Sequence, residues 1–266
     1  MFIHNFDPVL VDLGIFQIKW YSIAYIVGII IGWVYAIKII NLTTVNKYNF
    51  HSVKKIHFDD LVTYIILGII LGGRIGYIIF YNFDYYSQNL LEIFKIWNGG
   101  MSFHGGLLGV IIATIIYSIK IKDNFLKFTD IISCVAPIGI FLGRIANFIN
   151  GELYGKITNV PWSIIFPDGG NVGRHPSQIY EAGLEGVLLL FLINYFALKK
   201  KLLFKTGFIS GIFLILYSIF RIFSEFFREP DNHLGYFFNY FSLGSLLSIC
   251  TLTFGMIIIF YTKKNE

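Results

Sequence analysis

Residues 131–155 read IISCVAPIGIFLGRIANFINGELYG, an apolar run that ends in polar residues. The run from Ile131 to Leu142 is typical of a membrane-spanning helix, and Arg144 and Asn147 follow where such a helix should be ending. These two residues are three positions apart, so they share one face of a helix. Because charged and amide side chains are costly in lipid, the stretch indicates either anchors at the membrane surface or a polar site within a helical bundle.

The composition of the whole chain decides the class of protein. Of its 266 residues, 56% are hydrophobic and only 14% are charged, whereas a soluble domain carries about 25% charged residues. We therefore expect an all-α polytopic membrane protein, with residues 1–266 forming a single transmembrane helical-bundle domain. The predicted spans are 20–40, 60–81, 103–120, 129–149, 177–198, 207–227 and 241–261.

Lysine and arginine concentrate in alternate connections between these spans, which predicts the orientation of the chain. The basic connections and tail hold Lys38, Lys47, Lys54, Lys55, Lys120, Lys122, Lys127, Lys199, Lys200, Lys201, Lys205, Lys263 and Lys264, against Lys19, Lys95, Lys156, Arg174 and Arg228 on the other side. We therefore expect the N-terminus outside and the C-terminus in the cytoplasm. The longest outer connection, 150–176, should form a small extracytoplasmic cap, with a short strand or hairpin within Ile157–Phe166.

Several function classes are disfavoured. The net charge of +5 does not indicate nucleic-acid binding, because the basic residues are scattered between apolar runs. Cys134 and Cys250 lie inside apolar runs without metal-site spacing, and the glycine patterns of nucleotide-binding loops are absent. We therefore expect no metal and no cofactor.

The alternation of spans brings uncommon polar residues to the outer ends of several helices. Tyr217, Arg221, Glu225 and Arg228 follow at intervals of four, four and three, which puts them on one helix face. The other residues at this level are Tyr21, His104, Arg144, Asn147, His175, Ser177, Gln178, Tyr180 and Glu181. They predict a cavity toward the outer leaflet, where arginines can clamp the phosphate of a lipid headgroup and a histidine can move a proton. This combination suggests group transfer from a phospholipid.

Alternatives remain at this point. His104 could be an interfacial residue, Arg221 and Glu225 could form a structural pair, and Arg74 could serve helix packing, lipid anchoring or catalysis. Ser177 has no histidine–aspartate partners in sequence, which disfavours a serine nucleophile and an intramembrane protease. An anionic-phospholipid transporter or flippase, and a receptor that binds signal peptides, are the other candidate functions.

The stretch GRIANFINGELYG at 143–155 resembles the signature of the bacterial prolipoprotein diacylglyceryl transferase family, Gly-Arg-x-Gly/Ala-Asn-Phe-x-Asn-x-Glu-x-x-Gly. Further segments that resemble this family are GGRIGYIIFY at 72–81, GGMSFHGGLLG at 99–109, HPSQIYEA at 175–182 and EFFREPD at 225–231. The resemblance implies a seven-span enzyme of the bacterial inner membrane, with its active site toward the outer leaflet. It would transfer the diacylglyceryl group of phosphatidylglycerol to the lipobox cysteine of a prolipoprotein, forming a thioether and releasing glycerol phosphate.

The resemblance also implies roles for individual residues. The essential histidine of the family falls on His104, and its phosphate-binding arginines fall on Arg144 and Arg221. Its other functional positions fall on Tyr21, Asn147, Glu152, Gly155, Tyr217, Glu225 and Arg228. Whether His104 or an arginine–tyrosine pair activates the thiol is left open. The expected partners are phosphatidylglycerol, prolipoprotein signal peptides with a lipobox cysteine, and membrane lipids, and the protein is expected to be a monomer.

Overall fold

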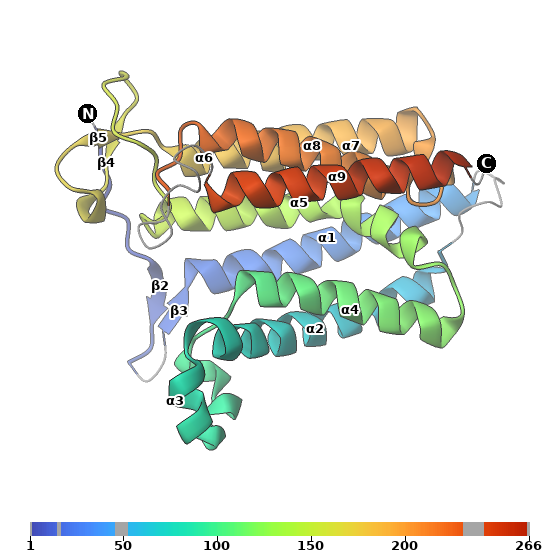
Figure 1. The fold of residues 1–266 in the computed structure, drawn as a ribbon, viewed down its shortest axis with the longest axis horizontal. Coiled ribbons are helices and arrows are strands. Elements are labelled where there is room, and N and C mark those ends of the chain that lie inside the picture. Colours follow the sequence, from blue (N-terminus) through green and yellow to red (C-terminus); the bar gives the residue numbers. More distant parts are fainter. Residues whose placement is uncertain (1, 15–16, 46–52, 231–241, 265–266) are drawn as a thin grey trace. The chain divides into compact units, whose positions relative to one another are not determined.

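The computed structural model describes residues 2–14, 17–45, 53–230 and 242–264 (Figure 1). Within these ranges, seven helices are long and apolar enough to cross a membrane, which confirms the prediction of an all-α polytopic membrane protein. Six of them are α1 (Trp20–Val45), α2 (Lys55–Tyr81), α4 (Phe103–Ile121), α5 (Phe125–Ile149), α8 (Phe208–Glu225) and α9 (Leu243–Lys264). The seventh, between α5 and α8, is one continuous run of four consecutive segments: α6 (Ser177–Glu181), η4 (Ala182–Leu188), α7 (Leu189–Asn194) and η5 (Tyr195–Lys199). Lys47, Asp231 and residue 241, where the seventh span was predicted to begin, lie outside the described residues.

The chain divides into two compact units. One unit comprises Met1–Ile39 with Asp130–Glu266, and the other comprises Ile40–Thr129. The prediction of a single bundle domain over residues 1–266 therefore stays a prediction.

In the unit Ile40–Thr129, α2 and α4 pack against each other through glycines. A Cβ atom on Gly76 would lie 2.8 Å from the Cα of Gly105, and one on Gly72 would overlap the Gly105 carbonyl oxygen. Gly68 and Gly109 approach each other in the same way. The small residues let the two backbones touch, as their spacing predicts. Between these helices, α3 (Phe83–Gln88) and the 3₁₀ turns η1 (Leu90–Phe94) and η2 (Ile96–Asn98) lie at one end of the pair (Figure 1).

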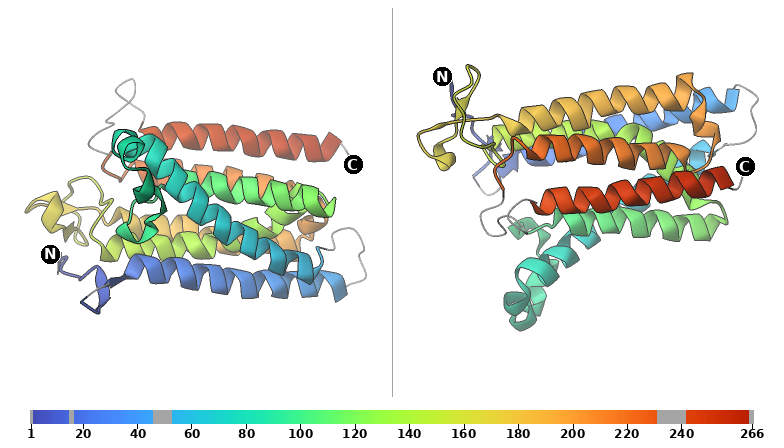
Figure 2. Two further views of the ribbon diagram at one scale, coloured as in Figure 1. Left: turned by 90° about the horizontal axis from the view of Figure 1, so that it is seen from below. Right: turned by 45° about the horizontal axis from the view of Figure 1, so that its top comes forward.

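In the other unit, a buried carboxylate joins α5 to α8. Asp130 accepts hydrogen bonds from the backbone N–H groups of Gly207 (2.6 Å) and Ser210 (2.8 Å), and from the Ser210 hydroxyl (2.7 Å). It therefore supplies acceptors for the otherwise unpaired donors at the first turn of α8. Helix α9 lies beside α8 (Figure 2), and a Cβ atom on Gly255 would lie 2.9 Å from the carbonyl oxygen of Gly211.

Short strands form the cap predicted for residues 150–176. Strand β4 (Ile164–Ile165) pairs with β5 (Gly173–Arg174) and, in parallel, with β1 (Phe2–Ile3). The prediction of a strand within Ile157–Phe166 is confirmed, although both of its partners lie outside that range. Strands β2 (Val9–Asp12) and β3 (Gln17–Lys19) form a separate hairpin before α1, and the remaining 3₁₀ turns are η3 (Pro167–Gly169) and η6 (Leu202–Phe204).

Candidate functional site

A cluster of ion pairs joins α5, the α6–η4 segment and α8. Arg144 on α5 places Nη1 2.8 Å from Oε2 of Glu181 and Nη2 2.9 Å from Oε2 of Glu185. Both glutamates are fully buried, so each needs an opposite charge close by. Arg144 therefore bridges two carboxylates that lie one turn apart.

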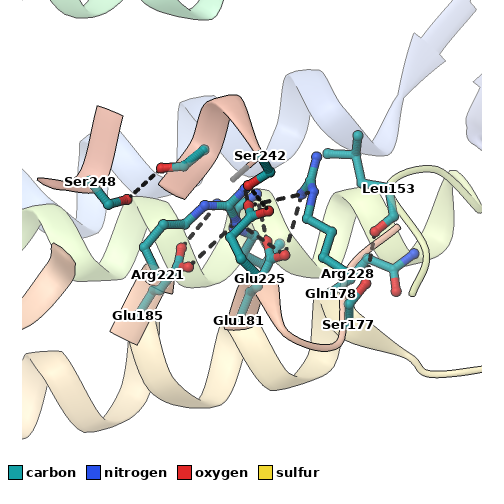
Figure 3. A network of polar contacts seen from close by, with 12 residues as sticks. Leu153, Ser177, Gln178, Glu181, Glu185, Arg221, Glu225, Arg228, Ser242 and Ser248 are labelled. Atoms are coloured by element: carbon teal, nitrogen blue, oxygen red, sulfur yellow. Dashed lines mark hydrogen bonds and ion pairs between the residues drawn. The ribbon is translucent and has the colours of Figure 1, made fainter. Parts of the chain in front are cut away.

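Arg221 of α8 and Arg228, three residues after the end of α8, complete this cluster (Figure 3). Nη1 of Arg221 lies 3.1 Å from Oε1 of Glu181, and Nη1 of Arg228 lies 3.3 Å from the same oxygen. Arg221 also pairs with Glu225, whose other oxygen accepts a 2.7 Å hydrogen bond from the Ser242 hydroxyl. Glu181 is thus contacted by Arg144, Arg221 and Arg228. Three arginines face three glutamates, so the arginine–glutamate cluster carries no net charge when all six are ionised.

Helical spacing explains how these side chains meet. Arg221 and Glu225 share one face of α8, and Arg228 continues that face in the turn after the helix, where its N–H bonds to the Ser224 carbonyl, as their intervals of four and three predict. Glu181 and Glu185 are four residues apart, and the second lies in η4, which has π-helical hydrogen bonding. Wider turns of this kind are frequent at functional sites. Arg221 and Glu225 do form an ion pair, but the pair is part of a larger cluster, because Arg221 also contacts Glu181 and Glu185.

The family-like signature itself is a helix end. The N–H of Glu152 bonds to the carbonyl of Asn147 (3.2 Å), and the N–H of Gly151 bonds to that of Phe148 (3.0 Å). Gly151 has φ +68°, which makes this a glycine-terminated Schellman turn. The turn brings the Glu152 carboxylate back to the helix, where Oε1 accepts hydrogen bonds from the amides of Asn147 (2.8 Å) and Asn150 (3.3 Å).

Residues beyond this turn tie it to α6 and to the segment that follows α8. The side chain of Gln178 donates to the Glu152 carbonyl (2.6 Å), and the Ser177 hydroxyl donates to the Leu153 carbonyl (2.9 Å). Gly155 forms an isolated β-bridge with Arg228, and a Cβ atom there would come within 2.6 Å of the His175 carbonyl oxygen. Only glycine fits between these two segments.

The predicted site residues in this unit therefore fall into two groups. Arg144, Arg221, Glu225 and Arg228 belong to the arginine–glutamate cluster. The second group, Asn147, Glu152 and Gly155, lies at and after the end of α5. Tyr21 belongs with this group, because the Asn147 amide donates a hydrogen bond to its hydroxyl at 3.4 Å. Tyr217, one turn before Arg221 on α8, stacks on Phe213, and its predicted support of Arg221 stays a prediction. His104 is the second residue of α4, in the unit Ile40–Thr129, so its place beside the arginines also stays a prediction.

Sequence reasoning missed the two glutamates at the centre. Glu181 was noted at the start of a span but given no role, and Glu185 was not considered. The available signal was their spacing, since two carboxylates four apart in an apolar run must share a buried face and need cations. In the described ranges, no three His, Cys, Asp or Glu residues are grouped as a metal site would require.

His175 lies two residues before the start of α6, outside the membrane-spanning segments, and its side chain is partly buried. Its Nδ1 lies 3.2 Å from the hydroxyl of Tyr180, and its ring packs edge-on against Phe227. Burial lowers the pKa of His175 from its usual value, because the charged imidazolium loses solvation. The lowered pKa of His175 favours the neutral imidazole at the start of α6.

The arginine–glutamate cluster holds several guanidinium groups in fixed directions. Every guanidinium in the arginine–glutamate cluster faces a carboxylate, and carboxylate oxygens resemble phosphate oxygens in how they accept paired N–H donors. A phosphate that approaches Arg144 and Arg221 beside the glutamates would find N–H donors already oriented.

Comparison with known proteins adds the family. The sequence model described as prolipoprotein diacylglyceryl transferase matches residues 8–261. The chain is 49% identical over 255 residues to a Rickettsia felis protein named phosphatidylglycerol–prolipoprotein diacylglyceryl transferase, covering 96% of each chain. It is 48% identical over 259 residues to the Rickettsia typhi protein of the same name, covering 97% of this chain and 98% of the relative.

Proposed function

The chain belongs to the prolipoprotein diacylglyceryl transferase family, and from this membership we propose that it transfers the diacylglyceryl group of phosphatidylglycerol to prolipoproteins. The acceptor is the thiol of the lipobox cysteine. The observation that carries the proposal is the position of Arg144, the arginine of the signature, in a buried cluster of oriented cations. The enzyme is a transferase that acts on two lipid-embedded substrates and requires no cofactor.

The first chemical step is activation of the thiol. A cysteine of ordinary pKa, about 8.5, is only about 3% thiolate at pH 7. His104 accepts the thiol proton, and the thiolate attacks the glyceryl carbon that is bonded to the phosphate oxygen. The sulfur–carbon bond forms as the carbon–oxygen bond breaks, and the electron pair leaves with glycerol phosphate. A pair formed by an arginine and Tyr21 is the alternative activating group.

The second task is to stabilise the departing phosphate. Arg144 and Arg221 both reach Glu181, within 2.8 and 3.1 Å, so one phosphate bound beside Glu181 would lie near both guanidinium groups. Such preoriented donors count most where water is scarce. Arg144 is only 17% exposed and Arg221 only 12%, which supports this role.

The remaining predicted residues orient these groups. Asn147 and Glu152 are held together at the end of α5, close to Tyr21, and we assign them to the lipid headgroup. Gly155 allows the backbone of the signature to approach Arg228, and Glu225 holds Arg221 from the next turn of α8.

The protein is a multi-pass membrane protein, and its finer placement is part of the proposal. We place it in the bacterial inner membrane as a monomer, with the N-terminus outside and the site toward the outer leaflet. The distribution of lysine supports this orientation. A lipid flippase would need access to the arginines from both faces, whereas the predicted polar residues gather at one.

The decisive experiment is a mass assay with purified protein, phosphatidylglycerol and a synthetic signal peptide with a lipobox cysteine. We expect the peptide to gain one diacylglyceryl group, with release of glycerol phosphate and no gain from phosphatidylethanolamine. His104→Gln should lower the rate by roughly 10²–10⁴-fold, as expected for loss of a general base. Arg144→Gln should also lower the rate, because it removes a cation proposed to stabilise the departing phosphate. Lys19→Gln, which removes an exposed cation of β3, is the matched control and should leave the rate unchanged.

The outcomes separate the functions. A loss below tenfold for His104→Gln would exclude His104 as the base and favour the arginine–tyrosine pair. Binding of phosphatidylglycerol without any modified peptide would exclude the transferase and leave lipid transport.

A further inference from the structure

Arg74 on α2 is buried in a shell of backbone carbonyl oxygens. It is 4% exposed, and its guanidinium lies 5.0 Å from the centre of the Tyr86 ring. The hydrogen bonds run from Nε to Ile93 (2.9 Å), from Nη1 to Gly99 (2.5 Å) and Gly100 (3.3 Å), and from Nη2 to Glu92 (2.6 Å) and Lys95 (3.2 Å). A guanidinium has five N–H donors, so five carbonyl acceptors use all of them.

This geometry decides between the roles considered for Arg74. A phosphate-binding arginine must offer donors to its ligand, and a lipid anchor must reach the membrane surface. The donors of Arg74 all point to the segment 92–100 of its own unit. Arg74 therefore organises the chain between α3 and α4.

The carbonyls that it gathers lead directly to the predicted catalytic histidine. Gly99 and Gly100 have φ of +82° and +81°, a conformation that favours glycine, and a Cβ atom on Gly100 would strike the Tyr77 ring. The N–H of Ser102 then bonds to the carbonyl of Gly73, next to Arg74 in sequence (2.8 Å). The path of the backbone from Gly99 to Ser102 is thus held by consecutive residues of α2.

Ser102 fixes the first turn of α4. Its Oγ accepts a hydrogen bond from the N–H of Gly105 (3.2 Å), which makes it the N-cap of the helix that carries His104 at its second position. On the other side of His104, Gly105 touches Gly72 and Gly76 of α2. Residues 72–76 therefore hold the chain both before and after His104.

We propose that Arg74 is a positioning residue for His104, and that it sets the direction of the imidazole by holding the Gly99 and Gly100 carbonyls. This inference rests on the proposed function, in which His104 takes the proton of the substrate thiol. A misplacement of about 1 Å can lower a rate by roughly 10²-fold without contact between the changed residue and the substrate.

The first test measures kcat and KM for Arg74→Lys in the mass assay. Lysine keeps the charge but presents its donors from one atom, so it cannot hold carbonyls on three sides. We expect kcat to fall by about 10–100-fold while KM for phosphatidylglycerol changes less than about twofold. Lys95→Gln is the control, because it removes a partly exposed cation from the same segment and keeps the backbone carbonyl. It should leave kcat unchanged, whereas a raised KM and an unchanged kcat for Arg74→Lys would overturn the proposal.

A double-mutant cycle separates positioning from a general structural effect. If Arg74 acts through His104, Arg74→Lys should cost less than about twofold in a His104→Gln background, because the group that it positions is gone. The same 10–100-fold loss in both backgrounds would overturn the proposal. Where Arg74→Lys does not fold, Ser102→Ala breaks the same path at the helix cap, and the same two outcomes apply.

A readout without turnover keeps this test independent of the proposed function. Failure of the wild-type protein to modify any peptide would reject the transferase. The modification of His104 by diethylpyrocarbonate, located by peptide mass, still reports its surroundings. We expect the rate to change at least threefold in Arg74→Lys and to stay constant in Lys95→Gln, and an unchanged rate in Arg74→Lys would overturn the positioning role.

Discussion

The side-chain amide of Asn147 donates a 2.8 Å hydrogen bond to Oε1 of Glu152, five residues further along the chain. In an uninterrupted helix these side chains would point in different directions, since each residue turns the chain by about 100°. They meet because α5 ends between them and Gly151 adopts φ +68°. The polar part of the signature is therefore one compact turn that depends on a single glycine.

Gly151→Ala should weaken this turn. The left-handed conformation costs a non-glycine residue about 1–2 kcal/mol, and the new Cβ atom would lie 3.1 Å from the His4 ring, whose Nε2 bonds to the Phe148 carbonyl. We expect a loss of about 2 kcal/mol in the free energy of unfolding and reduced transfer in the mass assay. Gly183→Ala is the control, since among the described residues no atom outside the neighbouring backbone of its own helix lies within 4 Å of the added methyl group. Equal stability of the two variants would contradict the account of the turn.

Glu181→Gln should be among the most destabilising conservative changes in the chain. It leaves Arg144, Arg221 and Arg228 without their shared carboxylate, and breaking a buried ion pair costs about 3–5 kcal/mol. Thermal unfolding in detergent measures the loss. Glu229→Gln removes the partner of Arg174 at a site that is 38% exposed, where a pair contributes about 0–1 kcal/mol. If both changes cost the same, the cluster is not held together through Glu181.

Asp130→Ala should destabilise α8 from its first turn. Three donors, on Gly207 and Ser210, would lose their acceptor inside the protein, at about 1–3 kcal/mol for each unsatisfied group. Hydrogen exchange should rise first in the opening turn of α8, and the free energy of unfolding should fall by about 3 kcal/mol. Asp12→Asn, at the exposed end of strand β2, should change neither. Unchanged exchange in α8 would show that the cap is dispensable.

His175 should make stability fall at acid pH. Its pKa in the folded protein is lowered by burial, so the unfolded chain binds the proton more readily. The contribution of neutral His175 is complete above the unfolded pKa, about 6.5, and is lost as the pH falls through the lower folded value. Melting temperatures measured from pH 7.5 to 5 should drop less in His175→Gln than in the wild-type protein. Parallel curves would exclude His175 as a source of this dependence.

The membrane helices were predictable because their signal is local and strong. Predicted spans 103–120 and 177–198 correspond to Phe103–Ile121 and Ser177–Lys199, since the bilayer requires about 20 consecutive apolar residues. The close packing of α2 on α4 also has a local origin, because glycines four residues apart, such as Gly68, Gly72 and Gly76, leave one helix face without side chains. The face shared by Arg221, Glu225 and Arg228 also follows from helical spacing alone.

The rest depends on contacts between distant segments, for which a single sequence carries little signal. Nothing near Phe2 and Ile3 indicates that they pair with Ile164 and Ile165, because two-residue strands have no detectable period. The carbonyls that surround Arg74 carry no side-chain signature at all. Asp130 was read as part of an apolar span, although a buried carboxylate there required donors, which α8 supplies.

Asp130, which offers acceptors to α8, lies about four turns of α5 before Arg144 of the arginine–glutamate cluster. Along α5, Asp130 and Arg144 are separated by 14 residues, or about 21 Å, and both are tied to α8, one directly and one through Glu181. A single contact would allow one helix to rotate against the other, whereas two separated contacts prevent this rotation. Helices α5 and α8 are therefore fixed to each other at two levels, so we expect that the lipid path required by the proposed function does not open between them.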